Sequence, residues 1–310
     1  MRTIVHAREF LATARAVASC LLLCGAVFAA LLIVRPMQAQ QPQPQKTDAA
    51  KDPESQSGNN DLGRQSPLRR HERPFMFQVS SDTQYFHDSN VLLADGDLIK
   101  QGADTVLLQS FGASFTPPLV ERLTSTVFYH HEMVRYDRLS EFDFDADTAG
   151  LRLAYPAENW CKVYGGFSAA RHAFEGDGGE FYKFYDTRLG VVCEQPLTRR
   201  ALLTYGCQFD WRPSSPASLS RVDEAVYAGL NVALMDKLTA QLNYRLRARE
   251  YLEAGRTDLD HLAVLTLGYA FNNHVTVRVF ASYGDNVSTV KTHDYQVLTT
   301  GGGLHLTFKF

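Results

Sequence analysis

The sequence predicts an all-β protein, namely an antiparallel transmembrane β-barrel of about twelve strands. Three observations lead to this prediction. Apolar side chains recur at every second residue in segments of about ten residues, short and long connections alternate, and the last segment is an alternating strand that ends on an aromatic residue. A hydrophobic share of 45%, with 19 Phe and 14 Tyr, suits such strands.

Composition removes several other classes of protein. The 310 residues have a mean hydropathy of −0.22, which is far too low for a bundle of membrane-spanning helices. The formal net charge is −3, and Lys and Arg form no basic tract, so we expect no nucleic-acid partner.

Residues 1–39 have the pattern of a secretory signal peptide. Residues 1–15 are basic, residues 16–34 carry no charge, and Ala39 offers a small residue to a signal peptidase. The 19-residue apolar run is also long enough to span a bilayer, so an uncleaved anchor stays open as an alternative.

Residues 40–73 predict a disordered polar linker or tail. The segment contains no aromatic residue and almost no branched aliphatic residue, so it cannot bury enough surface to order itself. The barrel domain is therefore expected at 74–310.

Within that domain, alternation is clearest where Leu238, Leu242 and Leu246 share one face with Ala240 and Tyr244. The expected strands are 75–86, 105–116, 123–134, 148–156, 160–171, 181–194, 201–212, 224–235, 238–249, 261–271, 275–284 and 295–310.

Connection lengths sort by parity. The connections after even-numbered strands are short, as at 157–159 and 272–274, whereas those after odd-numbered strands are long and polar, as at 87–104 and 135–147. Outer-membrane barrels have short periplasmic turns and long extracellular loops. An even strand number then places both termini on the periplasmic side.

The polar face of the strands carries charge, which is expected inside a barrel wide enough to leave a channel. The candidate pore-lining residues are Asp186, Arg188, Asp210, Arg245, Arg247 and Arg278. In the alternative, a secreted or periplasmic β-sandwich, the aromatic residues would be core and these charges a solvated face.

The terminal strand resembles a known signal. Its apolar residues Leu304, Leu306, Phe308 and Phe310 look like the assembly signal of bacterial outer-membrane β-barrels, which implies recognition by the barrel assembly machinery. The stretches 85–90 and 283–288 resemble β-barrel porin families that are named for shape and not for substrate. The resemblance implies a location in the cell outer membrane, with lipid and lipopolysaccharide as partners.

Motifs for chemistry are sparse. His130 and Glu132 should face the lumen and His131 the lipid, so a metal site is less expected than a polar cluster at the rim. The acidic segment 141–147 lacks the Gly and Glu of an EF-hand, although a looser cation site stays open beside a solvated loop. No serine stands in a nucleophile motif, so we expect no enzyme, metal or cofactor.

Cys161 and Cys193 share the lipid-facing phase of neighbouring strands. They would lie opposite each other if the loop turns near residue 177, so a disulfide and two free thiols both stay open.

The function that follows is an outer-membrane, porin-like channel for passive diffusion of small polar or anionic solutes. Two alternatives remain. One is a non-conducting structural or export-associated barrel, and the less expected one is an outer-membrane lipid hydrolase.

Overall fold

The computed structural model describes residues 76–93, 102–118, 122–158, 160–175 and 179–310. The expected signal peptide at 1–39 and the linker at 40–73 lie outside these residues. Twelve long strands and one two-residue strand, β8, make up the fold. They are β1 (Phe77–Asp88), β2 (Asp104–Phe115), β3 (Thr124–Tyr136), β4 (Phe144–Glu158), β5 (Cys161–Phe174), β6 (Glu180–Pro196), β7 (Ala201–Arg212), β8 (Ser214–Ser215), β9 (Arg221–Ala233), β10 (Leu238–Tyr251), β11 (Arg256–Ala270), β12 (Val275–Ser288) and β13 (Tyr295–Lys309).

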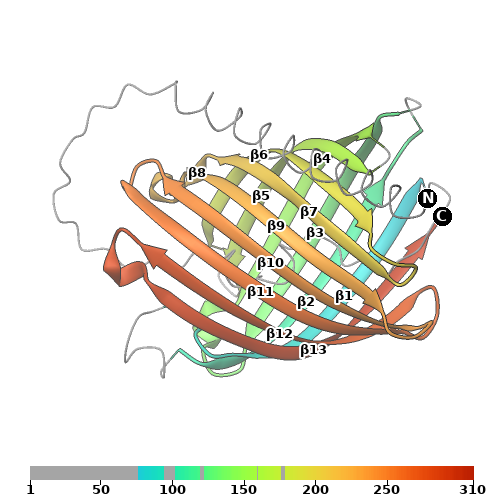
Figure 1. Ribbon diagram of the computed structural model, residues 1–310. Helices are drawn as coiled ribbons and strands as arrows, with labels where there is room; N and C mark the ends of the chain where they lie inside the picture. Colours follow the sequence, from blue (N-terminus) through green and yellow to red (C-terminus); the bar gives the residue numbers. More distant parts are fainter. Residues whose placement is uncertain (1–75, 94–101, 119–121, 159, 176–178) are drawn as a thin grey trace, which may run out of the picture. The chain divides into compact units, whose positions relative to one another are not determined.

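The twelve long strands form a closed antiparallel barrel (Figure 1). Each long strand pairs with its neighbour in sequence, β7 pairs with β9, and β1 pairs with β13 over eleven residue pairs from Gln78–Lys309 to Asp88–Thr299. The short β8 pairs only with β6. The predicted fold class and the predicted number of strands are confirmed. Within the described residues, no helix is long and apolar enough to span a membrane.

Several strands run farther than their sequence pattern indicated, and the larger extensions are at one end of the barrel. We call this end, where β1 connects to β2, the loop end, and the opposite end the turn end. β4 begins at Phe144, β9 at Arg221 and β11 at Arg256, whereas the sequence placed these starts at 148, 224 and 261. The connection between β10 and β11 shrinks to residues 252–255. The added residues of β9 and β11 are mostly polar. At the start of β4, Asp145 and Asp147 face outward and only the inward residues Phe144 and Ala146 are apolar, so a lipid-facing apolar pattern does not mark these strand ends.

The outward face is apolar. Phe167, Leu242 and Leu265 are exposed near the middle of their strands. On β11, Ala263, Leu265 and Leu267 are consecutive outward residues, and all three are apolar. Aromatic side chains at the strand ends are also exposed: Tyr155, Trp211, Tyr269, Phe271, Tyr283, Phe308 and Phe310. An apolar band flanked by aromatic residues on a closed barrel is the surface of a membrane-spanning barrel.

The inward face is divided into an apolar part and a charged part. At the loop end of β1 to β4, an apolar cluster of buried inward residues contains Phe86, Leu108, Val134 and Phe144. Phe280, from β12, joins it and lies 6.1 Å from the Phe86 ring. Phe280 breaks the lipid-facing pattern of its strand because it belongs to this interior cluster.

Cys161 and Cys193 form a disulfide. They are directly opposite in the β5–β6 register, with their Cα atoms 4.1 Å apart, on the outward phase near the turn end. Of the two alternatives that the sequence left open, the structure has the bridge. Cys207 lies on β7 and is not part of this disulfide.

Candidate functional site

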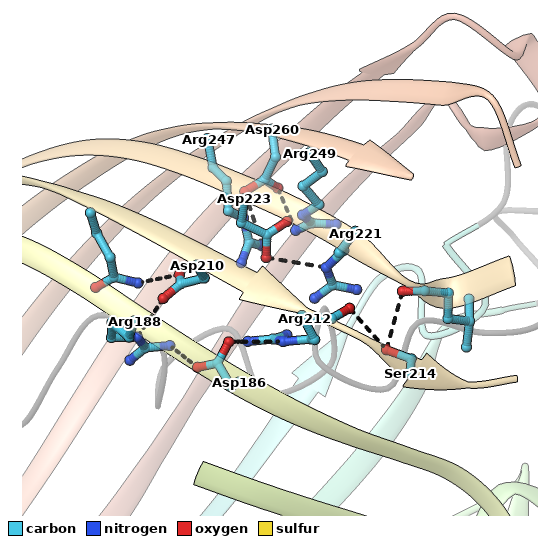
Figure 2. Close-up of polar contacts among 12 residues, drawn as sticks. Asp186, Arg188, Asp210, Arg212, Ser214, Arg221, Asp223, Arg247, Arg249 and Asp260 are labelled. Carbon is cyan, nitrogen blue, oxygen red and sulfur yellow. Dashed lines mark hydrogen bonds and ion pairs between the residues drawn. The ribbon is translucent and has the colours of Figure 1, made fainter. Parts of the chain in front are cut away.

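The candidate site is the charged part of the inner face, formed by five neighbouring strands (Figure 2). β6, β7, β9, β10 and β11 each direct two or three ionisable side chains inward near the loop end. We call this set the charged wall. Its members are Asp186, Arg188, Asp210, Arg212, Arg221, Asp223, Arg245, Arg247, Arg249, Arg256, Asp258 and Asp260.

The two-residue period of a strand and the antiparallel register explain why these charges meet. Arg188 of β6 lies opposite Asp210 of β7, and its Nε donates to Asp210 Oδ1 at 2.6 Å. One step along the same strand, Asp186 accepts from Arg188 Nη2 at 3.2 Å and from Arg212 Nη2 at 3.3 Å. Ion pairs therefore run both along and across the strands.

Two aspartates face each other within the charged wall. The register pairs Asp210 of β7 with Asp223 of β9, an arrangement that is unfavourable for like charges. Separate donors hold the two carboxylates: Asp210 accepts from Arg188 and from Gln208 Nε2 at 2.5 Å, and Asp223 accepts from Arg221 Nε at 3.1 Å. These arginines therefore offset the repulsion.

Asp260 of β11 lies among three arginines of β10. Arg245 Nη2 and Arg247 Nη2 are both 3.4 Å from Asp260 Oδ1, and Arg249 Nη2 is 3.5 Å from Asp260 Oδ2. All four side chains are at most 8% exposed. One carboxylate thus faces three guanidinium groups, which makes this the most positive place in the charged wall.

Aromatic rings fix two further guanidinium groups at the loop end. Arg212 lies over Phe184 at 4.5 Å from the ring centre, and Arg256 lies over Tyr251 at 3.8 Å. Cation–π contacts of this kind stabilise a charge that is removed from water. The arginines are therefore held in place from two sides, by carboxylates and by rings.

Toward the turn end, two tyrosines lie against the inner wall over glycines. A Cβ atom on Gly190 would overlap the Tyr164 ring, and a Cβ on Gly206 would lie 2.5 Å from the Tyr227 hydroxyl. Tyr164 OH donates to Gln208 Oε1 at 2.9 Å, which links the tyrosines to the charged wall. The glycines make room for flat tyrosines that occupy less of the lumen.

The predicted pore-lining residues all face inward, but they do not form one cluster. Asp186, Arg188, Asp210, Arg245 and Arg247 belong to the charged wall. Arg278 of β12 lies elsewhere.

Arg278 holds a second, smaller group of inward charges across β1, β12 and β13. Its Nη2 donates to Asp82 Oδ1 at 2.7 Å, and His305 Nδ1 is 3.0 Å from Asp82 Oδ2. A direct role of any of these residues in conduction stays a prediction.

Sequence reasoning missed five members of the charged wall. Arg221, Asp223, Arg256 and Asp258 lie in the parts of β9 and β11 that the sequence assigned to loops. Their alternation with Val222 and Thr257 is a usable signal, because each charged pair is separated by one residue. Arg212 was also missed, although it continues the phase of Asp210.

The other sequence motifs lie on the two faces of β3 and just before β4. His130 Nδ1 is 3.5 Å from Glu132 Oε1 on the inner face, while His131 faces outward toward Asp147, as expected. In the acidic segment, burial raises the pKa of the Asp143 carboxyl, which accepts the Tyr136 backbone N–H at 2.8 Å. The described part of the chain contains no group of three or more His, Cys, Asp or Glu residues placed to hold a metal ion.

Comparison with known proteins rests on the fold. No protein-family model matches the sequence, and no curated protein matches it. An outer membrane channel from Pseudomonas putida is similar, with a TM-score of 0.53 and 12% identity over 79% of this chain and 100% of that one. The chain therefore has the fold of outer-membrane β-barrel channels, and the expected location in the cell outer membrane agrees with this fold.

Two other solved structures are similar at lower TM-scores. A KdgM porin in complex with disordered oligogalacturonate has a TM-score of 0.42 and 9% identity, over 74% of this chain and 99% of that one. An anion-selective porin from Comamonas acidovorans has a TM-score of 0.41 and 10% identity, over 76% of this chain and 100% of that one.

Proposed function

We propose that the protein is a porin-like channel of the outer membrane for passive diffusion of small polar or anionic solutes. The charged wall carries this proposal. It contains seven arginines and five aspartates, so it has an excess of two positive charges on one side of the lumen. Fixed charges inside a pore select solutes by sign and size.

The dimensions of the barrel are consistent with a narrow passage. Twelve strands spaced about 4.8 Å apart and tilted by about 40° enclose a backbone cylinder about 24 Å across. Inward side chains narrow this space from both sides. The apolar cluster around Phe86 and Phe144 lies in the other part of the inner face at the loop end. An anion that passes would meet the seven arginines of the charged wall on one side, within a low-dielectric surrounding that strengthens their field.

Orientation and assembly belong to the same proposal. Both termini would lie on the periplasmic side with the turn end, and lipid and lipopolysaccharide would surround the barrel. Leu304, Leu306, Phe308 and Phe310 share the outward phase of β13, where the barrel assembly machinery could contact them. The Phe310 backbone also pairs with Phe77, at 2.9 and 3.2 Å, next to the closing β1–β13 seam.

Burial favours a second candidate, the non-conducting structural or export-associated barrel. Arg221 is 0% exposed and Arg249 is 2% exposed, so these members of the charged wall contact protein atoms and not open solvent. In this second candidate the ion pairs only neutralise one another and stabilise the loop end. The expectation that the protein is not an enzyme stays a prediction in both cases.

Conductance in planar bilayers separates the two candidates. The purified, refolded protein should conduct, and Arg245→Glu together with Arg247→Glu should shift the reversal potential in a salt gradient toward cation preference. A matched control is Arg199→Glu together with Arg200→Glu, which makes the same charge change on the exposed turn after β6. Bilayers that stay closed at all voltages would refute the channel and leave the structural barrel.

A further inference from the structure

A row of ionisable side chains lies on the outward face, near the loop end of four neighbouring strands. Antiparallel register places His131 of β3 opposite Asp147 of β4, Asp147 opposite Arg171 of β5, and Arg171 opposite Lys183 of β6. We call these four residues the outer row. Charge on the lipid-facing surface of a barrel is destabilising unless it lies near the interface. A role in the lumen cannot explain the outer row, because its charges are on the outside of the barrel.

Asp147 holds one half of the outer row in place. Its Oδ1 accepts from Tyr129 OH at 2.6 Å and lies 2.9 Å from His131 Nδ1, and its Oδ2 accepts from Arg171 Nη2 at 3.2 Å. One carboxylate thus orients the Arg171 guanidinium, whose side chain is still 59% exposed. Most of the guanidinium edge stays open to the surroundings of the barrel.

The other half of the outer row is a pair of like charges. Arg171 and Lys183 are direct cross-strand partners on the same face, an arrangement that repels. Lys183 is exposed, and among the described residues no carboxylate lies within ion-pair distance of its Nζ. An anion bound between the two cations would turn this repulsion into attraction.

Acidic groups nearby are occupied elsewhere. Arg135 of β3 lies four residues beyond His131 toward the loops, where its Nη2 is 2.7 Å from Asp145 Oδ1 and its Nε is 3.0 Å from Glu175 Oε2. These two carboxylates therefore face Arg135 and do not neutralise Lys183.

The height of the outer row indicates where the anion comes from. One step toward the turn end, Tyr129 and Tyr185 are exposed on the same face, and Phe167 stacks on Tyr185 with ring centres 6.1 Å apart. Aromatic residues of a barrel mark the membrane interface. Two residues along a tilted strand rise by about 5 Å, which brings the outer row to the level of the lipid headgroups.

We propose that Arg171 and Lys183 bind the phosphate group of a phosphorylated glycolipid in the surrounding outer leaflet. The two cations contact the phosphate oxygens, Asp147 positions Arg171, and the exposed rings of Phe167 and Tyr185 lie below against the acyl chains. This site rests on the proposed orientation, with the loop end at the outer leaflet, but it lies on the outside of the barrel and does not depend on conduction through the lumen.

The test uses native mass spectrometry of the full-length mature protein with diphosphorylated lipid A and with its dephosphorylated form as probes. The wild-type barrel should retain the diphosphorylated lipid and lose the dephosphorylated one. Arg171→Gln with Lys183→Gln should lower the affinity by about 30-fold, because each cation near a membrane surface contributes a factor of about five. Arg171→Lys should keep most of the binding.

The matched control is Arg199→Gln with Arg200→Gln, which removes two cations from the exposed turn after β6. Heat-modifiable mobility on gels should be the same for all variants, which shows that each barrel is folded. Equal lipid retention by the wild type and the Arg171/Lys183 double variant would overturn the proposal. Equal retention of the two lipid probes, or displacement of lipid A by millimolar inorganic phosphate, would also overturn it.

Discussion

Replacing Asp260 by Asn tests whether the charged wall is held together by its ion pairs. The substitution keeps the size of the side chain but removes the one charge that three arginines share at 3.4, 3.4 and 3.5 Å. At an effective dielectric constant of about 20, one such pair attracts with about 5 kcal/mol, which the mutual repulsion of the arginines reduces. Removal of one partner from a buried ion pair typically costs about 3–5 kcal/mol.

We therefore expect Asp260→Asn to lower the free energy of unfolding by about 3–5 kcal/mol, or at least a hundredfold in the folding equilibrium. Urea unfolding in lipid vesicles, followed by the fluorescence of Trp160 and Trp211, measures this change. If the protein conducts, the same variant should become more anion-selective, because the lumen gains one net positive charge. Adding Arg247→Gln to Asp260→Asn should restore part of the stability.

The control is Asp236→Asn on the exposed turn between β9 and β10, which removes the same charge outside the lumen. Its unfolding midpoint should stay at the wild-type value. If Asp260→Asn unfolds at the same urea concentration as the wild type and Asp236→Asn, then Asp260 does not stabilise the charged wall. Buried arginines would then have to be neutralised without Asp260.

Three further predictions concern the barrel. Gly206→Ala should cost about 1–3 kcal/mol in vesicle unfolding because its Cβ would overlap the Val191 backbone oxygen and would lie 2.5 Å from the Tyr227 hydroxyl. Gly268→Ala, with its nearest atom at 3.4 Å, should be near neutral. The Cys161–Cys193 bridge spans 32 residues of sequence, so its reduction should lower the free energy of unfolding by about 3–4 kcal/mol in the chain-entropy account. Urea unfolding with and without reductant measures this change, and equal midpoints would contradict it. The Asp294 carboxyl accepts a backbone N–H at the end of β12, which holds its pKa below the usual range. The β12–β13 loop should therefore lose stability as the pH falls through that lowered pKa, and Asp294→Asn should abolish this dependence in limited proteolysis.

Both charged and apolar side chains fill the lumen, but only the charged ones are predicted by the sequence pattern. On β10, Arg245, Arg247 and Arg249 are visible as a ladder because strand alternation continues without interruption. On β1 and β12, Phe86 and Phe280 point inward, although apolar residues of a membrane barrel are expected outside. The two rings contact each other inside the barrel. The two-residue period of one strand does not predict a contact between residues of different strands.

Local chemistry determined much of this protein. A membrane-spanning sheet follows from the two-residue period, the alternation of connections and the terminal strand that ends at Phe310. The sheet must close into a barrel, because unpaired backbone groups at a sheet edge are not tolerated in lipid. The same period also predicts which side chains share the inner face, including Asp186, Arg188 and Asp210. These properties depend on neighbours within one strand, so the sequence contains them directly.

The tertiary structure decided which charges meet. That Asp260 faces three arginines, that Cys161 lies opposite Cys193, and that Arg171 lies opposite Lys183 all depend on the register between strands. A shift of one residue in register moves every side chain to the other face of the pairing, and the sequence of one strand does not specify that register. Register is set by closure of the whole barrel, so the site emerges only when all twelve long strands are paired.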